Sequence, residues 1–356
     1  MRKTIGAVES RNDKNVMLCS SQMRSYAFSV RELPALCALF TLALVCGLSP
    51  AAAAPLLYVT NEGANTVSVI DTATNHAVAA ITVGASPSGI AVTPDGSRAF
   101  VANAGSNSIS VIDTAARLVV ATIPAGVEPA GVAAAPSGKY AAAANEGSGN
   151  ISLIDTQTNR VAATIPAGNR PYGIAIAPDG KRAYVANLSG SISVIDLVSN
   201  RLEASIPAGG NPTAVAIAPD GKRAYVTNGS SSTVSVIDTQ SNKVVAAIPA
   251  GDGTSGIAIT PDGARAFAVN EGSGDVTVID TATGKPVATV TAGGERPFAI
   301  AISPDGKRAY VTNGYGANTV SVIDTAVNAV VAEIPAGERP IGIAAAPMVK
   351  APSGAQ

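Results

Sequence analysis

Short apolar runs alternate with turn residues along the whole chain after residue 54. The stretch that begins at Arg170 is representative and reads RPYGIAIAPDGKRAYVANLSGSISVIDLVSNRLEASIPAGG. No window in it keeps the 3.6-residue apolar period of an amphipathic helix. It holds four runs rich in β-branched and small residues, GIAIA, RAYVAN, SISVID and RLEASIP, which are bounded by Gly, Pro, Asn and Asp. We name these runs A to D, and they predict four short strands.

This unit recurs seven times along the chain. An aspartate ends every run C, and neighbouring aspartates are 41–44 residues apart: Asp71, Asp113, Asp155, Asp196, Asp238, Asp280 and Asp324. An asparagine ends every run B in step with them: Asn61, Asn103, Asn145, Asn187, Asn228, Asn270 and Asn313. Four strands in a period of about 40–45 residues are typical of one blade of a β-propeller.

The two ends of the repeat region are out of phase with the unit. The first run, at Leu57–Asn61, is a run B, and the last, at Pro340–Pro347, is a run A with nothing after it. Pairing these fragments closes a ring and removes two exposed sheet edges, which an open stack of repeats would not need. We therefore predict an all-β fold over residues 55–347. It is a seven-bladed β-propeller with four antiparallel strands per blade and a 3+1 closure, in which the C-terminal strand completes the N-terminal blade.

Three of the B runs, at residues 58–61, 225–228 and 310–313, read Tyr-Val-Thr-Asn. With the adjoining S-P-D-G-K-R-A-Y, V-S-V-I-D-T and I-P-A-G segments, they resemble the YVTN family of β-propeller repeat proteins over residues 55–347. The pattern departs locally at Ser137, Ala142 and Thr254. The resemblance implies an exported or surface-layer-type propeller. More distantly, the chain is similar to the haem d1 propeller of nitrite reductase and to lactonase propellers, so the family name settles the fold and leaves the activity open.

An export signal is expected at residues 1–54. An apolar run of 14 residues at 35–48 follows Arg24 and Arg31 and is followed by four alanines at 51–54. A basic flank, a short apolar core and a small-residue end predict a signal peptide, and Met23 is a candidate for the true start. The run is short for a membrane span, which needs about 20 apolar residues. We expect the mature protein in the periplasm, secreted or at the cell surface, and residues 348–356 as a flexible tail.

The amino-acid composition excludes several kinds of catalytic and metal chemistry from the repeat region. The chain has a formal net charge of −1, one histidine, His76, and three cysteines, all before residue 55. Thiolate catalysis and cysteine-based metal centres are therefore excluded from the repeat region, and so is a triad that needs more than one histidine. His76 starts a run D, where we expect an exposed position. Without a basic surface, nucleic-acid binding is not expected. We expect no metal and no cofactor.

Most of the repeated polar residues have a structural explanation. The seven aspartates are expected to accept backbone N–H bonds of the turn that follows run C. The seven asparagines are expected to adopt positive φ or to form Asx turns before the glycine-rich loops. The charged residues of the P-D-G-K-R turns are expected to neutralise one another on one rim.

A ligand site should break the sevenfold pattern. In propellers the D–A and B–C loops share one face, and the D–A residues lie at the mouth of the central channel. The side chains that depart there from the repeat in size or charge are Arg170, Tyr172, Arg296, Phe298 and Arg339. Arginines bind carboxylate or phosphate, and aromatic rings stack on a sugar or a base, so these five are the candidate ligand-binding residues. Alternatively, Glu295–Arg296 and Glu338–Arg339 pair with neighbours across the rim, and these arginines bind no ligand.

The functional hypothesis is an exported, non-catalytic propeller that acts as a ligand-binding or protein-interaction scaffold. Its partner is an unknown protein or a small polar ligand, and a monomer is expected. One alternative is a hydrolase of lactonase type, in which Asp, Glu, Arg and Asn would carry the chemistry. The other is a redox accessory propeller related to haem d1 domains. It would need an axial haem ligand, and neither Cys nor a channel-facing His is expected in the repeat region.

Overall fold

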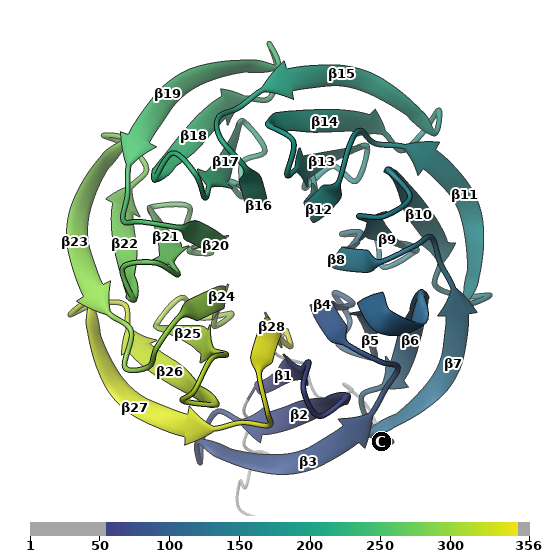
Figure 1. Ribbon diagram of the computed structural model, residues 1–356, viewed down its shortest axis with the longest axis horizontal. Helices are drawn as coiled ribbons and strands as arrows, with labels where there is room; N and C mark the ends of the chain where they lie inside the picture. The colour runs from purple at the N-terminus through teal and green to yellow at the C-terminus, as the bar shows by residue number, and fades with distance from the viewer. Residues whose placement is uncertain (1–54, 348–356) are drawn as a thin grey trace, which may run out of the picture. The chain divides into compact units, whose positions relative to one another are not determined.

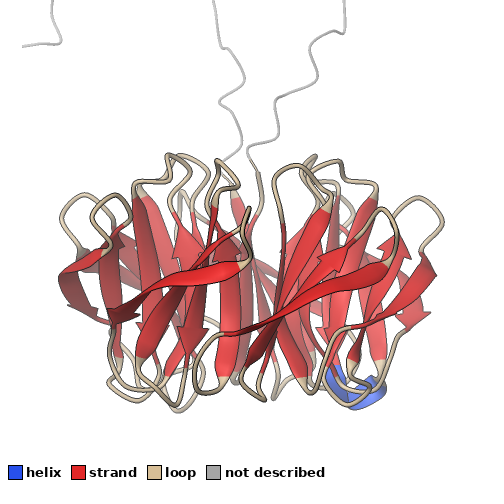
Figure 2. Cartoon of the chain, turned by 90° about the horizontal axis from the view of Figure 1, so that it is seen from above, coloured by secondary structure: helices blue, strands red, loops and turns tan. Residues whose placement is uncertain are grey.

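Twenty-eight strands form seven four-stranded antiparallel sheets around a central axis (Figure 1). This is a computed structural model, and it describes residues 55–347; the predicted signal peptide and the predicted tail lie outside the described residues. The loops lie on the two faces of the ring (Figure 2). The one helix of the described part is the three-residue 3-10 helix η1 (Ala104–Ser106), so no described helix is long and apolar enough to cross a membrane. The predicted seven-bladed propeller is confirmed.

Each blade contains one strand of each kind, and the order A-B-C-D runs from the axis to the perimeter (Figure 1). The A strands are β28 (Pro340–Ala345), β4 (Pro87–Val92), β8 (Pro129–Ala134), β12 (Pro171–Ile176), β16 (Pro212–Ile217), β20 (Thr254–Ile259) and β24 (Pro297–Ile302). The B strands are β1 (Leu56–Asn61), β5 (Arg98–Asn103), β9 (Tyr140–Asn145), β13 (Arg182–Asn187), β17 (Arg223–Asn228), β21 (Arg265–Asn270) and β25 (Arg308–Asn313).

The C strands carry the most regular apolar alternation and are buried almost throughout. They are β2 (Thr66–Asp71), β6 (Ser108–Asp113), β10 (Asn150–Asp155), β14 (Ser191–Asp196), β18 (Thr233–Asp238), β22 (Asp275–Asp280) and β26 (Thr319–Asp324). The D strands form the exposed perimeter. They are β3 (His76–Thr82), β7 (Leu118–Pro124), β11 (Arg160–Pro166), β15 (Arg201–Pro207), β19 (Lys243–Pro249), β23 (Lys285–Thr291) and β27 (Ala329–Pro335). Apolar side chains of the B and C strands pack between neighbouring blades and form the core.

The last strand closes the ring as the phase of the repeats predicted. β28 pairs antiparallel with β1, with Val59 opposite Ile343 and Asn61 opposite Pro340. The composite blade is therefore β28-β1-β2-β3. Ile341 and Ile343 of β28 are more than 90% buried. The first and last parts of the described chain thus form one sheet, which gives seven complete blades.

The threonine of the Y-V-T-N segments has a role between blades. Where the register of the A–B pairing shifts, one backbone N–H of the A strand has no carbonyl partner in the sheet. The threonine hydroxyl accepts a hydrogen bond from this N–H. Gly342 N–H donates to Thr60 Oγ1 at 2.7 Å, and Thr60 Oγ1 donates to Ser88 O of the next blade at 2.5 Å. Thr312 makes the same connection to Ile341 O at 3.0 Å. The composite blade is therefore joined to both of its neighbours by such threonines.

We expect Thr312→Val to lower the free energy of unfolding by about 1–3 kcal/mol, because valine keeps the shape and leaves buried backbone groups unpaired. Chemical denaturation of the mature protein measures the change. Val269→Ala is a control at the equivalent position of the neighbouring blade, where no hydroxyl is present. We expect Val269→Ala to lower the free energy of unfolding only through the loss of its two methyl groups. An unchanged midpoint for Thr312→Val would show that this hydrogen bond does not stabilise the closure.

The seven repeated asparagines are buried and extended, so the expectation of positive φ was wrong. Asn103, for example, has φ −105° and is fully buried. Its Nδ2 donates to the hydroxyls of Ser108 and Ser110 on β6, at 3.2 and 2.9 Å. The same pattern joins strands B and C in the other blades, as at Asn228. Positive φ occurs instead at the residue before strand C, for example Asn107 at 51°. The asparagines therefore hold two strands together at the end nearest the B–C loop.

The turns on the opposite face use their charges in two ways. The aspartates that end the C strands accept hydrogen bonds from turn N–H groups, as Asp155 does from Thr158 and Gln157, and these bonds hold the pKa of the Asp155 carboxyl below its usual value. The arginines that begin several B strands reach the next blade, as Arg98 does to Thr156 O at 2.8 Å. The expected neutralisation of charge on this rim is found for Arg308, which pairs with Asp324. Arg98 instead donates to a carbonyl group of the next blade and ties the two blades together.

Candidate functional site

The second residue of every A strand lines a narrow channel on the axis. Five of the seven are small or aliphatic, and the two aromatic ones are Tyr172 on β12 and Phe298 on β24. The third residue of each A strand is glycine or alanine, because the neighbouring A strand approaches closely there. The cavity that these second and third residues line has a volume of about 130 Å³. The two rings thus occupy a channel that small side chains would leave open.

Both burial and the negative charge at this end of the channel change the pKa of the Tyr172 hydroxyl. Burial raises the pKa of its hydroxyl above the usual value, and the charge of Glu146 raises it further. Glu62 and Glu271 act in the same direction. Three carboxylates from different blades therefore act on one side chain at the axis. The hydroxyl stays protonated throughout the physiological pH range.

A pocket of about 530 Å³ lies where the D–A and B–C loops surround the channel, and we call it the mouth pocket. It includes three of the five residues predicted for ligand binding, Tyr172, Phe298 and Arg339. Arg170 and Arg296 are not among its lining residues. The full lining is Glu62, Ser86, Ser88, Ala104, Gly105, Glu128, Ala130, Glu146, Tyr172, Phe298, Tyr315, Arg339 and Ile341.

Each of the three predicted arginines pairs with a glutamate of a B–C loop. Arg170 Nη2 lies 2.6 Å from Glu146 Oε1, and Arg296 pairs with Glu271; both pairs bridge neighbouring blades. Arg339 Nη2 lies 3.1 Å from Glu62 Oε2 within the composite blade. The ion pairs agree with the alternative that Arg296 and Arg339 pair with neighbouring side chains on this rim. The guanidinium charges are neutralised before any ligand arrives.

Tyr315 joins two of these arginines. The Cζ atoms of Arg296 and Arg339 lie 4.1 and 5.1 Å from its ring centroid, and Arg339 Nη2 donates to its hydroxyl at 3.2 Å. Stacking of guanidinium on an aromatic face contributes about 0.5–1 kcal/mol at an exposed site. Tyr315 therefore fixes the side of the pocket that Arg339 lines.

Sequence reasoning missed the glutamates and Tyr315. The available signal was the tripeptide Asn-Glu-Gly, which follows strand B in three units, at residues 61–63, 145–147 and 270–272. The same number of units carry Arg-Pro before strand A. Glu146 precedes Arg170 by 24 residues, and Glu271 precedes Arg296 by 25. Charged residues that co-occur in this way in loops of one face indicate ion pairs.

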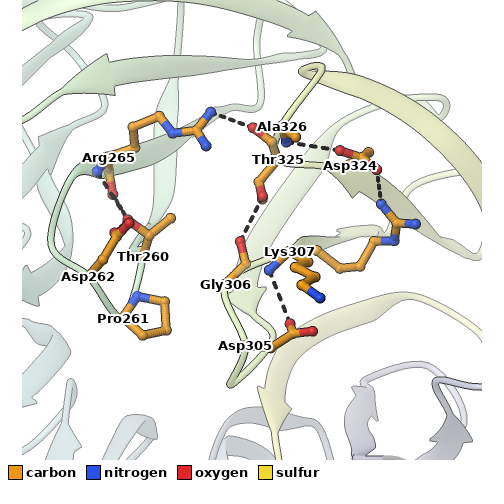
Figure 3. Close-up of a pocket in the computed structure, with 11 residues that line it drawn as sticks. Thr260, Pro261, Asp262, Arg265, Asp305, Gly306, Lys307, Asp324, Thr325 and Ala326 are labelled. Atoms are coloured by element: carbon orange, nitrogen blue, oxygen red, sulfur yellow. Dashed lines mark hydrogen bonds and ion pairs between the residues drawn. The ribbon is translucent and has the colours of Figure 1, made fainter.

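A pocket of about 650 Å³ lies on the opposite face between the blades of β20–β23 and β24–β27 (Figure 3). Its polar side chains mostly serve the turns that line it. Asp262 Oδ1 accepts from Ala264 N–H, and Thr325 Oγ1 donates to Gly306 O at 2.7 Å. Arg265 reaches Thr325 O, and Arg308 pairs with Asp324. A similar groove recurs between the blades of β12 and β16. Repetition and internal pairing make this groove a consequence of blade packing.

Neither the single histidine nor a cluster of metal-binding side chains offers a second site in the described part. His76 is exposed on the perimeter at the start of β3, with its ring Nδ1 2.6 Å from Thr74 O. Within residues 55–347, no group of three or more His, Cys, Asp and Glu side chains is arranged to hold a metal ion. The mouth pocket is therefore the candidate functional site.

Fold and pocket together define a seven-bladed propeller with an asymmetric site at one end of its channel. The family comparison is more specific, because the Virginiamycin B lyase family matches residues 73–350. The chain belongs to that family. The YVTN resemblance fits the same fold, but that family name was not found by the comparison.

Similar solved structures share the propeller fold. Hydrazine synthase of Kuenenia stuttgartiensis is 27% identical, with a TM-score of 0.66 over 74% of this chain and 92% of that chain. A functionally unknown protein from Desulfotomaculum acetoxidans is 20% identical, with a TM-score of 0.74 over 82% and 99%. Dihydro-haem d1 dehydrogenase NirN is 18% identical, with a TM-score of 0.61 over 81% and 74%. The last two likenesses show the fold alone.

A curated relative matches only locally. PE-PGRS family protein PE_PGRS18 of Mycobacterium tuberculosis is 60% identical over 38 residues, which is 11% of this chain. The match spans 8% of the length of that protein. This match concerns about one blade.

Proposed function

We propose that this protein is an exported, non-catalytic propeller that binds a small ligand in the mouth pocket. One observation carries the proposal: three of the five side chains that break the sevenfold repeat, Tyr172, Phe298 and Arg339, line one cavity of about 530 Å³. Ligand pockets usually measure about 300–1,000 Å³ and combine apolar walls with a few polar groups. Tyr172 and Phe298 supply apolar surface, and Glu62, Glu128, Glu146 and Arg339 supply the polar groups.

The five residues that the sequence suggested have different roles in this proposal. Tyr172 and Phe298 contact the ligand as the floor of the pocket, and Arg339 contacts it from the side. Arg170 orients Glu146 through their ion pair, and Arg296 supports Tyr315 by stacking. Arg170 and Arg296 are therefore positioning residues.

Restoring the small residue of other blades tests the floor of the pocket. We expect Tyr172→Ala or Phe298→Ala, which reproduce Ala130 of β8, to weaken binding of a hit from a thermal-shift ligand screen about tenfold. Tyr140→Ala is the matched control, because Tyr140 begins strand β9 at the end nearest the opposite face. A ligand whose affinity ignored both floor substitutions, or fell equally with Tyr140→Ala, would place the site elsewhere.

Export follows from the sequence of residues 1–54. We expect the mature chain to begin at or near Pro55, because an uncleaved apolar run of 14 residues would expose a large hydrophobic patch. N-terminal sequencing of exported protein, expressed with its start at Met23, measures the cleavage position. A mature chain that begins before residue 45 would contradict this assignment.

Lyase activity is a second candidate, because the chain belongs to a family named for a virginiamycin B lyase. Such a reaction needs a base, and the carboxylates that line the mouth pocket beside Tyr172 are the available groups. Incubation with virginiamycin B followed by liquid chromatography tests this activity. Loss of the substrate with the parent protein, and not with Glu146→Gln, would favour the enzyme over the binding scaffold.

A further inference from the structure

The two faces of the propeller differ in charge. The B–C and D–A loops, together with the strand ends that flank them, carry eight carboxylates and only three arginines among the described residues. The other basic residues between 55 and 347 lie on strand D or towards the opposite face. The face that holds the mouth pocket is therefore acidic, although the sequence had drawn attention to its arginines.

The ion pairs leave this excess of negative charge in place. Arg170, Arg296 and Arg339 are each matched by one glutamate. Glu128 lines the mouth pocket and takes part in none of the five ion pairs between described residues. An anionic ligand would have to displace a glutamate to reach a guanidinium, whereas a cation meets an unpaired carboxylate directly.

The backbone holds Glu128 at the edge of the pocket. Its φ is +52°, the left-handed conformation that the residue before the A strand adopts in every blade. Its N–H donates to Asn107 Oδ1 at 2.8 Å. The same position holds Ser86 in one neighbouring blade and Arg170 in the other. A fixed backbone with a variable side chain lets this position determine specificity without changing the fold.

Aromatic surface completes a site for a cation. The rings of Tyr172, Phe298 and Tyr315 line the same pocket as Glu128. The faces of aromatic rings attract ammonium groups, most strongly where water is excluded. Burial is the main cause of the raised pKa of the Tyr172 hydroxyl, and the charges of Glu146, Glu62 and Glu271 raise it further, so negative charge reaches this ring.

We propose that the mouth pocket selects an organic cation with an apolar body, whose ammonium group faces Glu128 and whose body lies on Tyr172 and Phe298. This inference rests on the proposed function, because it names the class of ligand for the same pocket. It replaces the carboxylate or phosphate ligand that the arginines suggested.

Two probes of similar size and opposite charge test the sign of the selectivity. Benzyltrimethylammonium and benzenesulfonate are titrated separately into the mature protein at low ionic strength, with binding followed by calorimetry or by NMR of the probe. We expect the cation to bind more tightly than the anion, and we expect its binding to weaken as salt is added. Glu128→Gln should weaken the affinity for the cation two- to fivefold, as expected for the loss of one exposed charge contact. The matched control Glu295→Gln removes the same charge from a D–A loop without touching the pocket lining.

The outcomes separate this inference from the proposed function. If benzenesulfonate bound more tightly and Tyr172→Ala abolished its binding, the proposed selectivity for a cation would be wrong and the mouth pocket would still be the binding site. Binding of the cation that fell equally with Glu128→Gln and Glu295→Gln would mean general attraction to an acidic face, which overturns the assignment to Glu128. Failure of both probes to bind would also overturn the inference. Binding of either probe that ignored Tyr172→Ala and Phe298→Ala would contradict the proposed site itself.

Discussion

Deletion of residues 338–356 is expected to abolish cooperative folding of the propeller. The deletion removes β28, whose Ile341 and Ile343 are more than 90% buried, and full burial of each such side chain contributes about 1.5–3 kcal/mol. It also removes the N–H that Thr60 accepts from Gly342 and the carbonyl that Thr312 reaches at Ile341. These losses approach the total stability of a typical domain, about 5–15 kcal/mol, and they open the ring. Circular dichroism during thermal unfolding measures the loss.

A shorter deletion is the control. Removing residues 348–356 is expected to leave the melting temperature unchanged, because MVKAPSGAQ has no strand pattern and follows the last residue of the composite blade. Both truncated chains lose the same C-terminus, so a general effect of shortening would appear in both. Equal melting temperatures for the two variants would contradict the closure by β28.

The strands and their closure were predictable because the determining interactions are local and repeated. Each apolar run and its turn residues specify a strand, and seven copies average out exceptions such as Ala142 in β9. The phase of the first and last runs was enough to predict that β28 pairs with β1. The contacts between blades were less accessible. Nothing local to Arg98 indicates that it reaches Thr156 O, because that contact depends on how two sheets twist against each other.

The candidate site was only partly predictable for the same reason. Tyr172 and Phe298 stood out because each replaces a small residue at a repeated position, and the structure places both in the channel. The charge of the mouth was misread because the glutamates that pair with the arginines were not identified. Glu146 is in another loop of another blade, 24 residues before Arg170, and only the ring geometry brings the two together. Departures from a repeat therefore located the pocket, and the pairing between loops determines its charge.

The close approach of the A strands leads to a second large effect, at Gly131 on β8. A Cβ atom there would overlap the carbonyl oxygen of Tyr172 on the neighbouring A strand, and at Gly256 it would lie 2.7 Å from Phe298 O. The obstacle is backbone, which cannot rotate away. Gly131 does not have a positive φ, so steric overlap, and not backbone strain, decides the effect of a side chain.

We expect Gly131→Ala to destabilise the protein by about 2 kcal/mol or more, within the range for overpacking a core. At a position without steric conflict, the same change would stabilise by about 0.4–1 kcal/mol, so the sign of the effect is diagnostic. Ala299→Gly is the matched control, because β24 already has alanine at the equivalent position; we expect it to cost about 0.5–1 kcal/mol through chain entropy alone. Denaturant midpoints of the two variants measure both effects.

The displaced carbonyl belongs to Tyr172, so this substitution should also act on the mouth pocket. We expect Gly131→Ala to weaken a bound cationic probe even at temperatures where the protein stays folded, whereas Ala299→Gly should not. Binding measured well below the melting temperature separates the two effects. A Gly131→Ala protein as stable as the parent would mean that the A strands can move apart at this interface, and the channel would then adapt its width to a ligand instead of presenting a fixed floor.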